Sequence, residues 1–297
     1  MALVTGPGAG GSSLARALRS AGVHVLDSAP VGAPVTSYAE EILAAGQATW
    51  WAPPELRTEW MDEPAVVSLA GQQRQAVTEA LQGGGVAGQG ALWFDERHPL
   101  LLDLWRDRPL NGLVLVWDSP SDAVVELRAH GIKALHAAAL WEDALQRALA
   151  AAVGQRTFVC SRTQLSGSDE VAEALLSFLQ TGGVGHNAAG AALTSVLAGH
   201  VPSSPGSEGD GRAELTELLE SRSGAHEEFA SVGELLLSGN SNELLDAHRA
   251  VYRLTTEARS AWLLADRADR EVVRAEARLT QSLTGVDFLV NHLLNAV

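Results

Sequence analysis

The sequence predicts a three-layer α/β fold, in which a short parallel sheet is flanked by helices, followed by an all-helical C-terminal region. Over residues 1–182, short apolar segments alternate with longer segments whose apolar residues follow helical spacing. The first apolar segment leads through a glycine-rich turn into a helix. Beyond residue 212 only helical spacing remains. These three observations define the fold class.

The strands are predicted from short apolar segments bounded by turn residues. Residues 113–117 form the clearest one, a continuous apolar run typical of a strand buried on both faces. Shorter segments at 2–4, 23–26, 91–93 and 156–160 complete the expected sheet. Because strands that alternate with helices form parallel sheets, we expect all of them to run in one direction.

The helices are predicted from apolar spacing together with start and stop signals. A helix opens at Ser12 or Ser13, and Ser37 begins a capping-box pattern with Glu40. Pro99 suits the first turn of a short helix. We expect further helices at residues 65–81, 121–130, 134–151 and 168–179.

The organisation of the chain changes after residue 182. Residues 183–212 are rich in Gly, Ala and Ser and predict a flexible linker. Residues 213–297 predict a helical region, with helices at 214–219, 225–237 and 242–283. The last of these carries an apolar stripe next to alternating charges, which suits either a solvated face or a helical hairpin or coiled coil that self-associates. The stripe comprises Leu244, Val251, Leu254, Ala258, Trp262 and Leu264.

Composition narrows the class of partner. The 297 residues carry a net charge of −15, which weighs against nucleic acid or an anionic membrane surface as a partner. Lys133 is the only lysine, and the one cysteine, Cys160, excludes an internal disulfide and a cysteine-based metal cluster. We expect a cytoplasmic protein, with no signal peptide, no membrane span and no metal site.

The glycine-rich turn fits two phosphate-binding templates imperfectly. Gly6, Gly8 and Gly11 satisfy G-x-G-x-x-G, and Asp27 follows the second predicted strand, near the position of a ribose-binding carboxylate. The P-loop template also fits, except that Ser12 stands where lysine is needed. From the residues alone, a phosphate site and a tight strand–helix turn that binds nothing are equally supported.

The order of several motifs resembles that of bacterial sulfotransferases that use 3′-phosphoadenosine 5′-phosphosulfate (PAPS). The family begins with a strand, a loop like G-x-x-R-S-G-T-S and a helix. Later come a Y-x-E segment, a K-D-P-R segment before a helix ending in Leu-Trp, and a strand ending in R-D-P. The collinear segments here are residues 6–13, 37–42, 94–105, 114–120, 139–142 and 159–165. The resemblance covers about the first 180 residues and implies a P-loop-like fold that binds PAPS or its desulfonated product PAP.

The resemblance also implies where this sequence departs from the family at the donor site. Ala9 stands where the family has a basic residue, with Gly10 for the usual serine, and Phe94 replaces the lysine of K-D-P-R. Trp117 replaces the arginine that binds the 3′ phosphate, and Glu126 replaces its serine partner. The candidate donor-binding residues are Gly8, Ala9, Gly10, Gly11, Ser12, Ser13, Trp117 and Glu126, of which Ser12 and Ser13 match the family's hydroxyl pair.

If the chain is an active enzyme, the resemblance implies transfer of a sulfuryl group from PAPS to a hydroxyl of a sugar or secondary metabolite. Arg97 would then assist, and Glu40 or His98 would be the base. Because several charges at the donor site are missing, our primary hypothesis is instead a sulfotransferase-fold protein whose donor site is lost or repurposed, a pseudoenzyme or scaffold. A third hypothesis is a dinucleotide-binding oxidoreductase. The partner is a small-molecule acceptor or a protein, and a homodimer through the C-terminal helices is one alternative.

Overall fold

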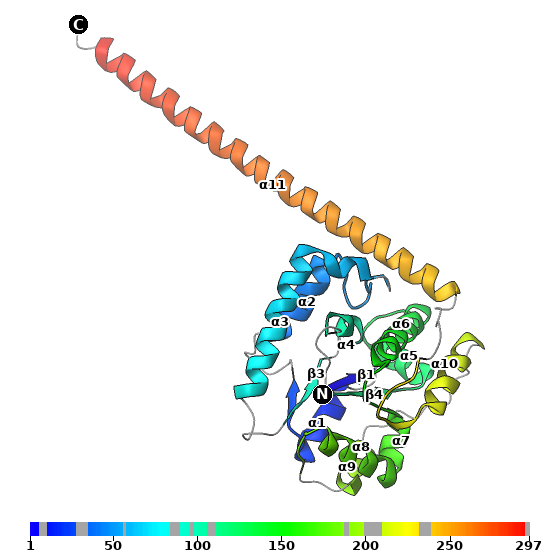
Figure 1. Cartoon of the computed structure of the whole chain (residues 1–297). Helices are drawn as coiled ribbons and strands as arrows, with labels where there is room; N and C mark the ends of the chain where they lie inside the picture. Colours follow the sequence, from blue (N-terminus) through cyan, green and yellow to red (C-terminus); the bar gives the residue numbers. More distant parts are fainter. Residues whose placement is uncertain are drawn as a thin grey trace. The chain divides into compact units, whose positions relative to one another are not determined.

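The computed structural model of the chain confirms an α/β fold built on a mostly parallel sheet (Figure 1). It describes residues 1–5, 11–27, 35–55, 58–83, 90–95, 98–105, 111–186, 190–198, 210–231 and 239–294. Within these ranges the strands form one sheet in the order β2-β3-β1-β4-β5-β6. The pairs from β2 to β5 are parallel, and β6 runs antiparallel to β5.

The five predicted strands are all present, within two residues of their expected bounds. The strands are β1 (Ala2–Thr5), β2 (Val25–Asp27), β3 (Leu92–Phe94), β4 (Leu113–Trp117), β5 (Thr157–Ser161) and β6 (Gly224–His226). The sequence predicts a helix over residues 225–237, but strand β6 occupies the first residues of that range. The predicted helix is therefore wrong at residues 225–226. The C-terminal region is therefore not all helical.

Helices cover both faces of the sheet. They are α1 (Gly11–Ser20), α2 (Val35–Ala45), α3 (Pro64–Gly83), α4 (His98–Leu101), α5 (Pro120–Ala129), α6 (Ala134–Ala152), α7 (Arg162–Gly167), α8 (Asp169–Thr181), α9 (Gly190–Ala198), α10 (Asp210–Ser221) and α11 (Gly239–Leu294). The 3-10 helices η1 (Thr58–Asp62) and η2 (Leu102–Trp105) complete the described elements. Most helices predicted in residues 1–182 are confirmed, and α7 is an addition.

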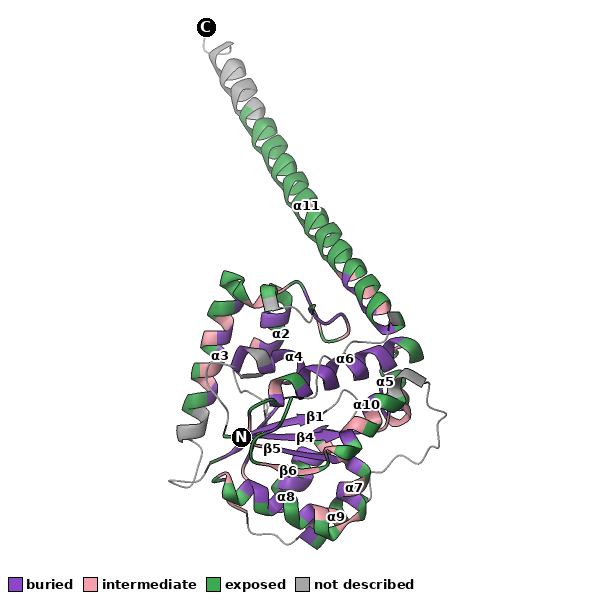
Figure 2. Ribbon diagram, turned by 45° about the vertical axis from the view of Figure 1, so that its right-hand side comes forward, coloured by how far each residue is buried: buried purple, intermediate pink, exposed green. Residues whose placement is uncertain are grey.

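The strands bury their two faces in two different cores, as the two-residue period of a strand requires. Leu3, Val114 and Phe158 pack with residues of α1, α8 and α9 on one face. Val4 and Leu115, one residue along, pack with residues of α6 and α10 on the other. Figure 2 shows these strands buried between the helices. Burial on both faces explains why the strands are apolar throughout.

A third core lies under α2, α3 and α4. Its centre is the pair Trp93 and Trp105, whose ring centroids lie 4.7 Å apart, packed with Ile42, Val66 and Leu101. The structure shows core packing for these two, which are both buried.

The chain divides into two compact units, Met1–Arg249 and Ala250–Val297. This differs from the expected division into residues 1–182, a linker at 183–212 and a helical region. Helix α9 lies within the expected linker, and its Leu193 and Leu197 are buried in the core beside α1 and α8. Strand β6 pairs with β5, and α10 packs on the sheet through Leu219. Segments far along the chain thus complete the α/β unit.

The entry of α1 is packed so closely against the sheet that only glycine fits at Gly11. A Cβ atom there would lie 2.6 Å from Oγ1 of Thr5 and 2.7 Å from the ring of Phe94. Both neighbours are buried and cannot move aside. We expect Gly11→Ala to lower the free energy of unfolding by about 1–3 kcal/mol, because overpacking a close-packed core displaces its neighbours.

Gly71 in α3 provides a matched control, since a Cβ there meets nothing within 4 Å. Gly71→Ala is expected to raise the free energy of unfolding by about 0.5–1 kcal/mol, because glycine is a poor residue inside a helix. Urea unfolding of the two variants measures both effects. Equal shifts in the two variants would contradict the close approach at Gly11.

Candidate functional site

Buried charged side chains follow three of the parallel strands, β3, β4 and β5, at the carboxyl edge of the sheet. Asp95 comes directly after β3, Asp118 after β4 and Arg162 after β5, and all three are buried. In open α/β sheets, ligands bind outside the carboxyl ends of the strands. This edge, at which β1 also ends, is therefore the candidate functional site.

Asp118 and Arg162 form a buried ion pair at this edge. Nε of Arg162 lies 3.0 Å from Oδ1 of Asp118, and the two side chains are 8% and 4% exposed. Nε1 of Trp141 donates a hydrogen bond of 3.0 Å to the backbone carbonyl of Asp118, which fixes the end of β4. Among the described residues, none donates a hydrogen bond to Oδ2 of Asp118. Within the described part of the chain, one oxygen of this buried carboxyl group therefore lacks a hydrogen bond and can carry a proton.

The surroundings make Asp118 titrate near neutral pH. Burial raises the pKa of Asp118 to about 7, the Arg162 guanidinium opposes the rise, and the carboxylates of Glu126 and Asp122 add to it. A carboxyl group that is partly protonated at pH 7 can both give and accept a proton. Asp118 is therefore the residue of this edge best suited to acid–base chemistry.

The corner between β4 and α5 is acidic and rigid. Ser119 caps α5: its Oγ accepts a hydrogen bond of 3.2 Å from the Asp122 N–H and donates one of 2.8 Å to Oδ2 of Asp122. Pro120 occupies the first turn of the helix. Ser119 is therefore the capping residue of α5. Three carboxylates, those of Asp118, Asp122 and Glu126, therefore surround this corner.

The structure places Trp117 inside the core. Its side chain is buried on the face of the sheet covered by α6, in the same core as Leu115 and Trp141. Glu126 is half-buried on α5, one helical turn beyond Asp122. The resemblance assigns the positions of Trp117 and Glu126 to binding of the 3′ phosphate. The structure has a buried indole at the first position and a carboxylate at the second.

The other predicted donor residues lie around the start of α1. Gly11 is buried, Ser12 is exposed and Ser13 is half-buried in the first turn of the helix. Gly8, Ala9 and Gly10 lie outside the described residues. The hydroxyl groups of Ser12 and Ser13 stand at a helix N-terminus, where the helix dipole favours an anion.

Of the three predicted catalytic residues, Glu40 is the one whose side chain the structure describes. Glu40 is exposed on α2. Arg97 lies outside the described residues, and His98 begins α4 with its side chain outside that description. The buried pair Asp118 and Arg162 lies at the ends of β4 and β5.

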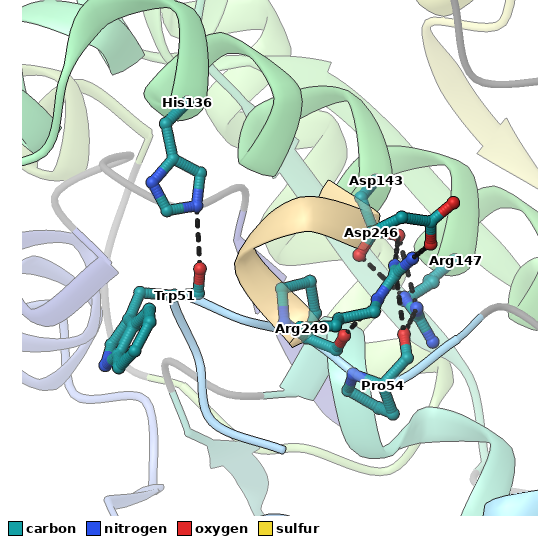
Figure 3. Close-up of polar contacts among 8 residues, drawn as sticks. Trp51, Pro54, His136, Asp143, Arg147, Asp246 and Arg249 are labelled. Carbon is teal, nitrogen blue, oxygen red and sulfur yellow. Dashed lines mark hydrogen bonds and ion pairs between the residues drawn. The ribbon is translucent and has the colours of Figure 1, made fainter. Parts of the chain in front are cut away.

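A second group of polar residues, which the sequence does not single out, holds the turn at residues 51–54 (Figure 3). His136 Nε2 lies 2.7 Å from the carbonyl oxygen of Trp51. Arg249 donates to the carbonyl of Pro53 at 2.6 Å, and Arg147 donates to that of Pro54. We call His136, Asp143, Arg147, His248 and Arg249 the α6–α11 polar cluster.

The α6–α11 polar cluster is structural. Asp143 bonds Arg147 at 2.8 and 3.1 Å and lies 3.9 Å from Arg249, so one carboxylate serves two buried guanidinium groups. The rings of His136 and His248 stack 3.6 Å apart, and burial lowers the pKa of both. The guanidinium groups of Arg147 and Arg249 bond backbone carbonyls of the turn and the carboxylate of Asp143. The cluster therefore fastens the first turns of α11 to α6. An Asp–Arg pair four residues apart, together with other polar residues along a mostly apolar helix, is the signal that could have revealed it.

The described part of the chain shows neither a metal-binding group nor a membrane-spanning helix. No three His, Cys, Asp or Glu side chains in it are grouped so that they could hold a metal ion. None of its helices combines the length and the apolar character needed to cross a bilayer.

Comparisons with known proteins found no match for this chain. No family model matches it, and neither a curated protein nor a solved structure matches it. The class that the fold defines is an α/β protein with a mostly parallel sheet, and function has to be argued from the site.

Proposed function

We propose that this chain is a sulfotransferase-like α/β protein whose PAPS donor site has been lost or repurposed, and that it acts as a binding protein or scaffold. The observation that carries the proposal is the acidic corner between β4 and α5. Trp117, Asp118 and Glu126 stand there, in the region where the resemblance would place the 3′ phosphate.

The electrostatics of this corner oppose a phosphate. Asp118, Asp122 and Glu126 would repel it, and the buried cation Arg162 is already paired with Asp118. The net charge of −15 adds a further unfavourable field. Each missing charge-assisted hydrogen bond to a phosphate removes about 1.5–3 kcal/mol of binding free energy. Loss at Ala9, Phe94 and Trp117 together lowers the affinity for PAP by several powers of ten.

An active PAPS-dependent enzyme with an atypical donor site is the second candidate. It is favoured by Asp118, whose pKa of about 7 suits a group that takes a proton from an acceptor hydroxyl. In this candidate the backbone at the start of α1, with Ser12 and Ser13, would hold the 5′ phosphate.

The dinucleotide-binding hypothesis receives less support from the strand order. Strand β3 lies between β1 and β2, whereas β1 and β2 are neighbours in the usual dinucleotide-binding sheet. We retain it only as a comparison in the binding test.

The proposal includes self-association through α11 and a cytoplasmic location. Beyond Ala250 the apolar side chains of α11 are exposed, among them Trp262 at 65% and Leu264 at 68%. A row of exposed apolar side chains favours binding to a protein partner, and we propose that the partner is a second copy of the chain. Cys160 is buried and unpaired, as suits a reducing compartment.

Calorimetric titration of the full chain with PAP tests the donor-site proposal. We expect no measurable heat of binding up to millimolar PAP, and no binding of NAD under the same conditions. A PAP dissociation constant in the low micromolar range would contradict the proposal and favour the second candidate. Saturable NAD binding would instead favour the dinucleotide hypothesis.

A further inference from the structure

Helix α11 carries an apolar seam that repeats every seven residues. All nine residues of this seam are Val, Leu or Ala and are exposed in the single chain. The α11 seam consists of Val251, Leu254, Ala258, Ala261, Ala265, Ala268, Val272, Ala275 and Leu279. Spacing of alternately three and four residues is the pattern of a coiled coil, in which two helices supercoil to keep the seam buried.

The seam is small in its middle and large at its ends. Its central layers, around Ala265 and Ala268, consist of alanine, so two helices can approach closely there. Leu254 and Leu279 stand near opposite ends, 62–65% exposed. An isolated helix leaves these leucines in water, and pairing with another seam buries them.

Charges beside the seam distinguish the possible orientations of two copies. Glu257, Glu271 and Arg278 each precede a seam residue and lie on one flank, whereas Asp269 and Glu276 lie on the other. In a parallel pair, opposite flanks meet, so Glu271 of each copy lies near Glu276 of its partner. The parallel arrangement therefore creates two like-charge contacts and offers no opposite-charge contact among these residues.

In an antiparallel pair the same flanks meet. With Ala265 of one copy opposite Ala268 of the other, Leu254 faces Leu279, and Glu257 faces Arg278 twice by symmetry. Asp269 of one copy then lies near Asp269 of the other. This single like-charge contact stands against the two favourable contacts between Glu257 and Arg278. A shift of the antiparallel register by one heptad in one direction brings Glu271 of one copy near Glu257 of the other. The opposite shift brings the two copies of Glu271 together. Both shifts place like charges in contact, so the unshifted register is favoured.

We infer that two copies of this chain associate through the α11 seam as an antiparallel coiled coil, with Glu257 of each paired to Arg278 of the other. This inference rests on the homodimer proposed above and adds its surface, orientation and register. Both Glu257 and Arg278 are exposed in the single chain. The pair is therefore available to a partner.

Disulfide trapping in the full-length chain tests the orientation. Leu254→Cys and Leu279→Cys variants are oxidised separately and as a mixture. The native Cys160 does not interfere, because it is buried and burial raises its pKa to about 12. In the antiparallel pair, the two copies of residue 254 lie about 38 Å apart, whereas residue 254 lies opposite residue 279. We expect crosslinked dimers in the mixture alone.

Leu263→Cys is the matched control, since Leu263 is 52% exposed and lies on the side of α11 away from the seam. It is expected to give no crosslink alone or in mixtures. Crosslinking of Leu254→Cys with itself would establish a parallel pair and overturn the inference while leaving the homodimer intact. A dimer that gives no crosslink in any mixture would place association on another surface and also overturn it.

Charge reversal tests the register independently. Glu257→Arg or Arg278→Glu alone is expected to raise the dimer dissociation constant by about tenfold, because each change makes two contacts of the symmetric dimer repulsive. The double variant exchanges the two charges and is expected to restore the dissociation constant. Light scattering of the unaltered chain separates the outcomes. A monomer at all concentrations would remove the homodimer and this inference together, but would leave the donor-site proposal to calorimetry.

Discussion

Replacing Asp143 with alanine is expected to lower the free energy of unfolding by about 3–5 kcal/mol. Asp143 is buried and serves two guanidinium groups, those of Arg147 and Arg249, which are themselves buried. Removing the carboxylate leaves two positive charges in the interior without their shared anion. The first turns of α11 should also lose their attachment to α6, since Arg249 holds the turn at Pro53.

Asp246→Ala is the matched control for this prediction. Asp246 also pairs with Arg249, at 2.6 Å, but its side chain is 56% exposed. Exposed pairs contribute little, so a loss below about 1 kcal/mol is expected. Guanidinium unfolding monitored by tryptophan fluorescence measures both variants. Comparable losses in the two would mean that the buried carboxylate has no special role.

The second large effect is a pH dependence of stability that belongs to Asp118. Its pKa is raised from 3.8 in the unfolded reference to about 7 in the native chain, so the native state holds the proton more tightly. The stability that this group contributes is therefore fully present below about pH 4 and is lost as the pH rises through about 7. A difference of about three pH units in pKa corresponds to about 4 kcal/mol.

Two histidines act in the opposite direction. The pKa values of His136 and His248 are lowered from 6.5, so the native state binds fewer protons there and stability falls as the pH falls below that value. These residues remain unchanged in an Asp118→Asn variant. The difference between the unfolding free energies of the wild type and this variant therefore isolates Asp118.

We expect that difference to favour the wild type most at pH 4 and to decline steadily to pH 8. Urea unfolding at unit intervals of pH measures it. A difference that stays constant over this range would show that Asp118 is ionised throughout, held so by the ion pair with Arg162.

Much of the sheet could be predicted because its strands depend on local pattern. Strand β4 begins and ends where the sequence predicts, since a run of five apolar residues between turn signals has few alternatives. Strand β6 (Gly224–His226) could not be found this way. Its three residues carry no apolar alternation, and it forms because β5 offers an open edge to a distant part of the chain.

Helices α7 and α9 were missed although signals for both existed. Ser161 and Gln164 form a capping box at the start of α7, a pattern readable in the sequence. In α9, Leu193 and Leu197 follow helical spacing within a segment whose Gly and Ser content suggested a linker. Tertiary packing of a few apolar side chains outweighed that composition.

At the candidate site, local pattern places Asp118 directly after a predicted strand but does not reveal its partner. Arg162 is far along the chain, and only the neighbouring ends of β4 and β5 bring the two together. The α6–α11 polar cluster was missed for the same reason, because Arg249 joins Asp143 from a distant helix. Contacts between strand ends and between distant helices depend on topology, which local pattern does not encode.

A crystal of the full chain soaked in millimolar PAP tests the central claim most directly. We expect no density for the nucleotide at the start of α1 or at the corner formed by Asp118, Asp122 and Glu126, with Arg162 still paired to Asp118 as it is without ligand. Continuous density for PAP beside Ser12 and Ser13, with its 3′ phosphate bound by an arginine, would contradict the loss of the donor site.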